Sequence, residues 1–107
     1  FIEPTLRGGK IIGEILHTDD FGNTITNIPA EFLDRIDASG RKLLRITVGG
    51  KSRTLKLCGT YGDVPAGTPL ALIGSSHFLE IAVSLGNAKE ILKTEPGQVV
   101  EVSLATD

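Results

Sequence analysis

The chain has 107 residues, a formal net charge of −2, 40% hydrophobic residues and 22% charged residues. This size fits one domain that buries about two thirds of its unfolded surface, and the small acidic balance gives no reason to expect nucleic acid or an anionic membrane as partner. The single cysteine, Cys58, excludes an intrachain disulfide and favours a reducing, cytoplasmic location. No apolar run is long enough to cross a bilayer, and we expect no signal peptide.

The first nine residues have the composition of a linker, with Pro4 and the pair Gly8-Gly9. Methionine is absent, including at position 1, so we expect a fragment or a processed product. We therefore assign residues 1–9 to a linker from a missing N-terminal domain and residues 10–107 to one C-terminal domain.

Alternating apolar and polar residues predict strands over most of the remaining chain. Residues 10–18 alternate with the period of two that a half-buried strand requires, and residues 24–28 are rich in β-branched side chains. Gly49-Gly50 is typical of a hairpin turn. A plain two-residue turn there would place Arg53 on the face of Ile46, so we expect a bulge or a longer loop. Seven strands are predicted in all, at about residues 10–18, 24–28, 44–48, 52–58, 70–73, 78–83 and 99–104.

Helical signals are few. Pro29 suits the first position of a short helix with Phe32, Leu33 and Ile36 on one face, which residues 38–40 end. A second stretch of one or two turns is expected at residues 87–92, with Asn87 as its N-cap. Seven strands, one or two short helices and no internal repeat predict an all-β fold, either a sandwich or a small closed barrel, which has no exposed edges.

The predicted turn Asp19-Asp-Phe-Gly-Asn23 places polar side chains around one aromatic ring. Asp, Gly and Asn suit the backbone angles of a turn, but a tight turn has no place to bury Phe21. Either Phe21 folds back onto the core, or it stands at the rim of a pocket as a stacking surface beside the Asn23 amide.

Other candidate residues have ordinary structural interpretations. Tyr61 is by default a half-buried core ring, and Glu80 a solvated carboxylate, although a carboxylate within an apolar strand is unusual. The spacing of His17, His77 and Cys58 does not match a metal site. No metal is therefore predicted.

Five motifs follow one another along nearly the whole chain. They are Asp19-x-Phe21-Gly22-Asn23, Thr26-Asn27-Ile28, Tyr61-x-Asp63-Val64, Gly74-Ser75-Ser76-x-Phe78-Leu79-Glu80-Ile81-Ala82-Val83 and Gly86-Asn87-Ala88. This ordered set resembles the C-terminal domain of S-adenosyl-L-methionine hydroxide adenosyltransferases, which are relatives of the fluorinase and chlorinase enzymes. The resemblance covers about residues 11–102.

The resemblance implies a seven-stranded Greek-key barrel in a subunit of two domains that forms a homotrimer. It also implies that S-adenosylmethionine binds as substrate between the N-terminal domain of one subunit and the C-terminal domain of its neighbour, a head-to-tail contact that a cyclic trimer repeats. No separate cofactor is implied. The family's residues that activate water lie in the N-terminal domain, so no catalytic residue is expected in this chain.

For the adenine part of the ligand, the resemblance implies that Asn23 pairs with the base edge and that Phe21 and Tyr61 flank the ring. The backbone around Asn87 and Ala88 would close on the base. These roles suit the residue types, because an Asn amide offers an acceptor and a donor that match adenine N6 and N7, and aromatic faces stack on bases.

For the methionine part, the resemblance implies that Asp19 holds the α-ammonium group and that Ser75 and Ser76 hold the carboxylate. Glu80 and Val83 would lie along the strand that faces the ligand. A carboxylate suits an ammonium group because the two form a charge-assisted hydrogen bond.

Departures from the family pattern bear on the nucleophile. In the halogenating relatives, arginines occupy the places that Ser76 and Gly86 hold here, which favours water over a halide as the group that attacks ribose C5′. His77 stands where glycine is frequent. The alternatives are a halogenase half, or a non-catalytic nucleotide-binding or trimerising barrel that shares only the fold. An oligonucleotide-binding barrel would need a basic groove with aromatic platforms, which this composition does not offer.

Overall fold

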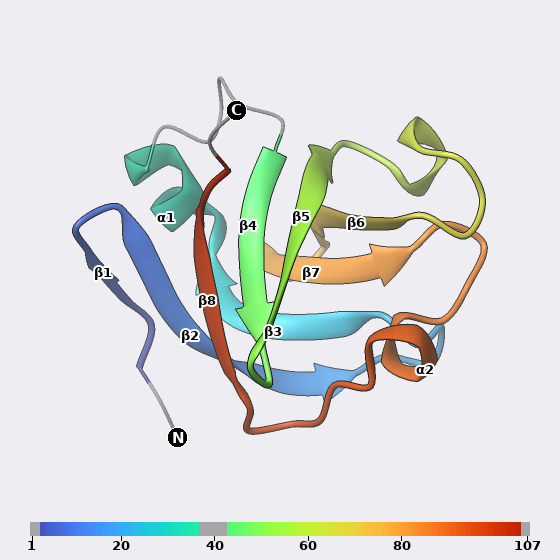
Figure 1. Ribbon diagram of the computed structural model, residues 1–107, viewed down its shortest axis with the longest axis horizontal. Coiled ribbons are helices and arrows are strands. Elements are labelled where there is room, and N and C mark those ends of the chain that lie inside the picture. The colour runs from blue at the N-terminus through green and yellow to red at the C-terminus, as the bar shows by residue number, and fades with distance from the viewer. Residues whose placement is uncertain (1–2, 37–42, 106–107) are drawn as a thin grey trace.

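Strands dominate the computed structural model, which describes residues 3–36 and 43–105 (Figure 1). Within these residues there are eight strands, two short α-helices and one 3-10 helix. The elements are β1 (Thr5–Arg7), β2 (Lys10–Thr18), β3 (Thr24–Pro29), α1 (Ala30–Arg35), β4 (Leu43–Val48), β5 (Lys51–Cys58), η2 (Tyr61–Asp63), β6 (Pro69–Ile73), β7 (Phe78–Val83), α2 (Ala88–Leu92) and β8 (Val99–Leu104).

Seven of the strands close into a barrel in the order β2-β3-β7-β6-β5-β4-β8, and β8 pairs back onto β2. The strand pairs are antiparallel except β5 and β6, which run parallel. Strand β2 closes the barrel because its Ile11–Glu14 half pairs with β8 and its Ile15–Thr18 half with β3. In Figure 1, β4 and β8 cross in front of β3 and β7, as two walls of one barrel. The predicted all-β, closed seven-stranded barrel is confirmed.

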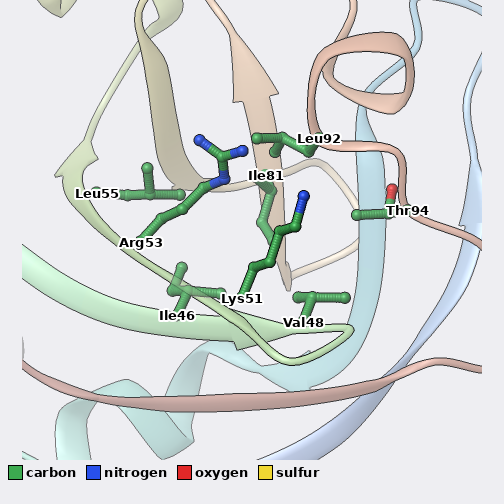
Figure 2. Close-up of a pocket in the computed structure, with 8 residues that line it drawn as sticks. All are labelled: Ile46, Val48, Lys51, Arg53, Leu55, Ile81, Leu92 and Thr94. Atoms are coloured by element: carbon green, nitrogen blue, oxygen red, sulfur yellow. The ribbon is translucent and has the colours of Figure 1, made fainter.

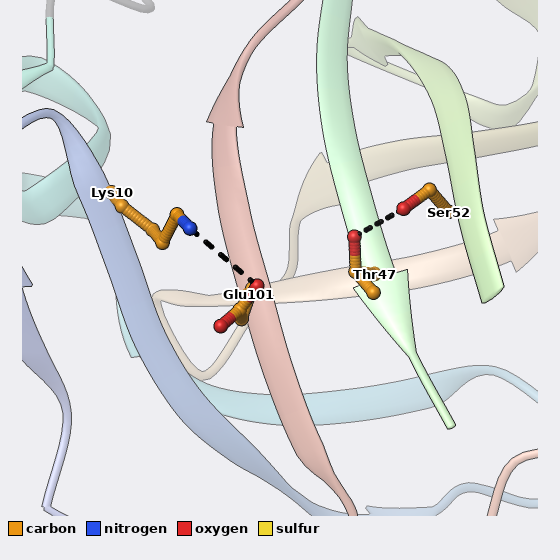
Figure 3. A network of polar contacts seen from close by, with 4 residues as sticks. All are labelled: Lys10, Thr47, Ser52 and Glu101. Atoms are coloured by element: carbon orange, nitrogen blue, oxygen red, sulfur yellow. Dashed lines mark hydrogen bonds and ion pairs between the residues drawn. The ribbon is translucent and has the colours of Figure 1, made fainter. Parts of the chain in front are cut away.

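The barrel interior holds one hydrophobic cluster, and every strand of the barrel contributes side chains to it. It contains Ile11, Ile15, Ile28, Leu33, Ile36, Leu44, Ile46, Leu55, Ala71, Leu79, Ile81, Val100 and Val102. Part of the outer face is polar: Figure 3 shows an ion pair of 3.8 Å between Lys10 and Glu101, and a hydrogen bond of 2.6 Å between Thr47 and Ser52. Such exposed pairs contribute little to stability. A second, smaller hydrophobic cluster consists of Cys58, Leu70, Leu72 and Ala82.

Strand β1 was not predicted. Gly8-Gly9, taken as a linker signal, forms the two-residue turn of a hairpin in which Arg7 pairs with Lys10. Both glycines have positive φ, +60° and +78°, which is why this turn favours glycine at both positions. Residues 5–7 therefore belong to the folded unit, as an extra strand beside β2. The assignment of residues 1–9 as a link to another domain stays a prediction.

The expected bulge after Gly49-Gly50 is wrong. Val48 pairs with Lys51 and Ile46 with Arg53 in an uninterrupted register. The inner face of β5 therefore begins with two cations, and Figure 2 shows Lys51 and Arg53 extending over an opening in the barrel toward α2. Their aliphatic stems cover the cavity of about 20 Å³ beneath them while their charges stay in water.

Both predicted helices are present. Pro29 is the N-cap of α1 rather than its first residue, and Leu33 and Ile36 pack into the core while Phe32 is partly buried. The residues predicted to end this helix, 38–40, lie outside the described residues. Among the described helices, none combines the length and the apolar character that crossing a membrane requires.

Candidate ligand-binding site

The Asp19–Asn23 turn is held by the Asp19 carboxylate. Its Oδ1 accepts hydrogen bonds of 2.9 Å from the backbone N–H groups of Phe21 and Asn23, and its Oδ2 accepts one of 3.3 Å from Asn23 Nδ2. The positive φ of the turn, +83°, falls on Gly22 and not on Asn23. Asn23 is therefore not needed at its position for a left-handed backbone angle.

Phe21 does not fold back onto the core. Its side chain is 79% exposed, because the hydrogen bonds to Asp19 turn this part of the chain away from the barrel. The interpretation of Phe21 as a buried turn residue is wrong, and its ring stands free at the rim of a hollow.

Tyr61 lies on the short helix η2, which Thr60 and Asp63 stabilise through a capping box. Its hydroxyl accepts a hydrogen bond of 3.0 Å from Asn23 Nδ2, so two segments 38 residues apart meet there. Burial raises the pKa of Tyr61, and the carboxylates of Glu80 and Asp19 raise it further. Tyr61 is thus part of a polar site rather than a core ring.

Helix α2 closes another side of this site. Asn87 is its N-cap, as predicted, and Asn87 Oδ1 accepts a hydrogen bond of 3.0 Å from the Glu90 N–H. The Lys89 N–H donates to the Gly22 carbonyl at 3.0 Å, which fixes the helix against the Asp19–Asn23 turn. A Cβ on Gly22 would collide with the Asn87 side chain, and Ala88 is fully buried.

These elements surround an open pocket of about 710 Å³. It is lined by Phe21, Asn23, Tyr61, Val83, Leu85, Gly86, Asn87 and Glu90. Five residues of the predicted site are therefore together, and the pocket combines two aromatic rings, apolar walls, two side-chain amides and one carboxylate. A planar heteroaromatic ring that offers hydrogen-bonding groups on its edge fits this lining.

Leu85 and Glu90 are pocket residues that the sequence reasoning missed. Leu85 is 92% exposed and has a φ of +51°, which is unusual for a residue with a branched side chain. The sequence offered one clue to Leu85. It follows an apolar strand and stands beside Gly86 and Asn87 in a predicted loop, where a leucine has no core to pack into.

Glu80 is not solvated. It is only 7% exposed, and its carboxylate lies against Gly74, where a Cβ would overlap it. Burial raises the pKa of Glu80, as does the negative charge of Asp19, and His17 opposes the shift. The site therefore contains two carboxylates, Asp19 and Glu80, close enough to affect each other, an arrangement that favours a bound cation.

Ser75 and Ser76 lie apart from this pocket, on the exposed turn between β6 and β7. Backbone hydrogen bonds from Gly74 to Phe78 and from His77 to Gly74 form the turn, and its connection to the site is the contact of Gly74 with Glu80. His77 has a φ of +67°. A left-handed angle explains why glycine suits this position.

No group of three His, Cys, Asp or Glu residues that could hold a metal ion occurs among residues 3–36 and 43–105. Within that part of the chain, the polar side chains that line the pocket are those of Asn23, Tyr61, Asn87 and Glu90, and the carboxylates of Asp19 and Glu80 act on Tyr61 from nearby. They can bind and orient a ligand that carries hydrogen-bonding groups and a positive charge.

The family model for the SAM hydroxide adenosyltransferase C-terminal domain matches residues 13–101. The chain belongs to this family. It is 37% identical over 94 residues to a protein named (R)-S-adenosyl-L-methionine hydrolase from Thermus thermophilus, a match that covers 84% of this chain and 31% of the relative.

Two solved structures share the fold. An uncharacterized conserved protein from Thermotoga maritima is 34% identical with a TM-score of 0.90, covering 95% of this chain and 39% of that protein. A conserved hypothetical protein from Thermus thermophilus is 33% identical with a TM-score of 0.61, covering 88% of this chain and 34% of that protein. The chain therefore spans about a third of the length of these relatives.

Proposed function

We propose that this chain is the ligand-binding C-terminal part of an enzyme that converts S-adenosylmethionine and water into adenosine and L-methionine. The observation that carries the proposal is the pocket lined by Phe21, Tyr61 and the Asn23 amide, which donates a hydrogen bond to the Tyr61 hydroxyl. This lining suits adenine. The nearby carboxylates Asp19 and Glu80 suit the positive charges of the ligand.

In this reaction the water oxygen forms a bond to ribose C5′ while the C5′–sulfur bond breaks. The electron pair of that bond stays on sulfur, which becomes the neutral thioether of methionine, and the water loses one proton. Since a sulfonium is already a good leaving group, the protein has to position the water and the ribose and to exclude bulk solvent. The residues of this chain bind and orient, and activation of the water belongs to an N-terminal domain.

The exposed apolar side chains at the pocket support an assembly in which another domain covers it. Phe21, Leu85 and Ile91 are 79%, 92% and 47% exposed, and such a cluster is typical of a ligand or protein interface. We propose that the N-terminal domain of a neighbouring subunit covers this surface in a homotrimer. We place the enzyme in the cytoplasm, in keeping with the lone Cys58.

The test is a product analysis of the full-length protein. Incubation with S-adenosylmethionine should release adenosine and methionine in equal amounts, at the same rate with or without added chloride or fluoride. The isolated 107-residue chain should show no turnover, because it lacks the proposed water-activating residues.

Each contrary outcome has a distinct meaning. A 5′-halogenated adenosine as product would identify a halogenase and contradict the roles given to Ser76 and Gly86. Binding of S-adenosylmethionine without turnover in the full-length protein would indicate a non-catalytic nucleotide-binding barrel. Turnover by the isolated chain would mean that the reacting groups lie in this chain after all.

A further inference from the structure

We propose that the barrel opening between the β4–β5 turn and the end of α2 is a binding site for a phosphate-type dianion. We call this opening the barrel mouth; its polar residues are Lys51, Arg53, Lys93, Thr94 and Gln98. The barrel mouth and the ligand-binding pocket share no lining residue. The inference therefore goes beyond the function proposed above and does not depend on it.

Two cations of the barrel mouth stand on the inner face of β5, where a barrel strand ordinarily carries core residues. Arg53 pairs with Ile46, which belongs to the hydrophobic core. Lys51 pairs with Val48 in the same register. Figure 2 shows both basic side chains extending over the opening toward Leu92. Two like charges on one face repel each other, and a bound anion would relieve that repulsion.

A third cation reaches the barrel mouth from the end of α2. Lys93 lines a cavity of about 90 Å³, and this cavity shares Lys51, Leu92 and Thr94 with the smaller one under Arg53. The φ of Lys93 is +55°, an angle at which glycine is the usual residue after a helix because it has no Cβ. Backbone strain of this kind is frequent at binding sites.

The ammonium groups and the side-chain amide along the larger cavity offer hydrogen-bond donors. Lys51 and Lys93 can only donate. Gln98 Oε1 already accepts a hydrogen bond of 2.8 Å from the Glu95 N–H, which fixes the orientation of the amide. A Cβ on Gly49 would lie 3.2 Å from Gln98 Nε2, so this nitrogen stands at the edge of the cavity, which Gly49 also lines.

No carboxylate balances these charges within the part of the chain that the structure describes. The one ion pair found there joins Lys10 to Glu101 on the outer face, and no described Asp or Glu lines the barrel mouth. Three positive charges and an amide donor therefore surround one cavity without an anion. A volume of about 90 Å³ equals the space of about three water molecules, which is room for one tetrahedral oxyanion.

The arrangement favours a dianion over a single carboxylate. Arg53 offers parallel N–H groups that match two oxygens of one oxyanion, and the ammonium groups of Lys51 and Lys93 suit the remaining oxygens. A monoanion would leave more of the positive charge unbalanced. The source of the dianion is either free inorganic phosphate or an organic phosphomonoester, because both present the same group.

The experiment is titration calorimetry of the full-length protein with inorganic phosphate and with glycerol phosphate, at an ionic strength held constant with sodium chloride. The wild type should bind phosphate saturably. Arg53→Gln and Lys51→Gln should each weaken binding by about tenfold, because each loses a charge-assisted hydrogen bond. Equal affinity for the two probes would identify free phosphate as the ligand, and tighter binding of glycerol phosphate would identify a phosphorylated molecule.

Arg45→Gln is the matched control. Arg45 is exposed on β4 next to the inward-facing Ile46, so this variant removes one positive charge from the outer face and should leave phosphate binding unchanged. Saturating S-adenosylmethionine should not displace phosphate, since the two sites share no lining residue.

Three results would overturn the inference. They are a wild type without saturable phosphate binding, equal losses of affinity in Arg45→Gln and Arg53→Gln, and displacement of phosphate by S-adenosylmethionine, which would locate the anion in the proposed substrate site instead. Each of them would leave the proposed function standing, because that function is tested by product analysis and not by phosphate binding.

Discussion

The two ends of the candidate site are built differently. The aromatic side (Phe21, Asn23, Tyr61 and Asn87) joins three separate segments by side-chain and backbone hydrogen bonds. The serine side (Ser75, Ser76 and His77) is one exposed turn held by its own backbone bonds. We infer that the aromatic side is formed before the ligand arrives, so that binding there costs little ordering, whereas the serine side has few contacts that fix its side chains.

The largest effect is expected from damage to the aromatic side at Gly22. An alanine there would need a left-handed angle, which costs about 1–2 kcal/mol, and its Cβ would displace the Asn87 cap, worth about 1 kcal/mol. Gly22→Ala should therefore lower the free energy of unfolding by about 2–3 kcal/mol, measured by urea denaturation, and weaken nucleoside binding.

Gly67→Ala is the matched control, since Gly67 has a φ of +84° and nothing within 4 Å of a Cβ position. It should cost only the backbone strain, about 1–2 kcal/mol, and leave binding unchanged. Equal losses of stability in the two variants would show that the Asn87 contact contributes nothing.

Glu80, which lies between the two sides, should make stability depend on pH. Burial and then Asp19 raise its pKa above the ordinary value of 4.5, with His17 opposing. Because the folded pKa is the higher one, the stabilising contribution of Glu80 is complete below the unfolded pKa and is lost as the pH rises through the folded pKa. At neutral pH, Glu80→Gln should therefore melt at a higher temperature than the wild type, and the difference should vanish in acid.

Removing the Asp19 charge tests whether that charge helps to raise the pKa of Glu80. In an Asp19→Asn background the charge that helps to raise the Glu80 pKa is absent, so the gain from Glu80→Gln at neutral pH should be smaller. The measurement is a double-mutant cycle: the melting temperatures of the wild type, Glu80→Gln, Asp19→Asn and the double variant are compared between pH 4 and pH 8. A Glu80→Gln effect that does not change with pH would contradict the buried, charge-coupled description of this residue.

On the serine side, we expect a substitution to weaken ligand binding and to leave the stability of the fold almost unchanged. Ser75 is exposed, so Ser75→Ala should change the free energy of unfolding by less than about 0.5 kcal/mol. If Ser75 holds the ligand carboxylate, as the resemblance implies, loss of that hydrogen bond should raise the KM for S-adenosylmethionine about three- to tenfold in the full-length enzyme. Ser52→Ala, on the outer face beside Thr47 (Figure 3), should change neither quantity. A normal KM in Ser75→Ala would remove Ser75 from the site.

The sequence predicted correctly those structural features that depend on residues adjacent in the chain. Strand alternation located all seven barrel strands, and Asn87 was identified as a helix cap from the residues that follow it. Strand β1 was missed because Gly8-Gly9 suits a linker and a tight turn equally, and only pairing with Lys10 decides between them.

The contacts within the site could not be predicted, because they join residues far apart in the chain. No local pattern shows that Asn23 donates to a hydroxyl 38 residues away, or that Glu80 is buried against Gly74. The family resemblance implied which residues belong to the site. It did not show how the Asn23 amide is oriented, since that depends on the acceptors that surround it in the folded chain.

The smallest effect is expected from His77→Gly, a substitution that should stabilise the protein. His77 has a φ of +67°, an angle that costs an L-residue about 1–2 kcal/mol. Glycine avoids that strain but loses about 0.5–1 kcal/mol more conformational freedom on folding, so His77→Gly should raise the free energy of unfolding by roughly 0.5–1 kcal/mol. Ser76→Gly is the control, because Ser76 has no positive φ to relieve, and it should be slightly destabilising. His77→Ala keeps the strained angle and should not stabilise; if it matches His77→Gly in urea denaturation, the gain comes from removing the imidazole and not from the backbone.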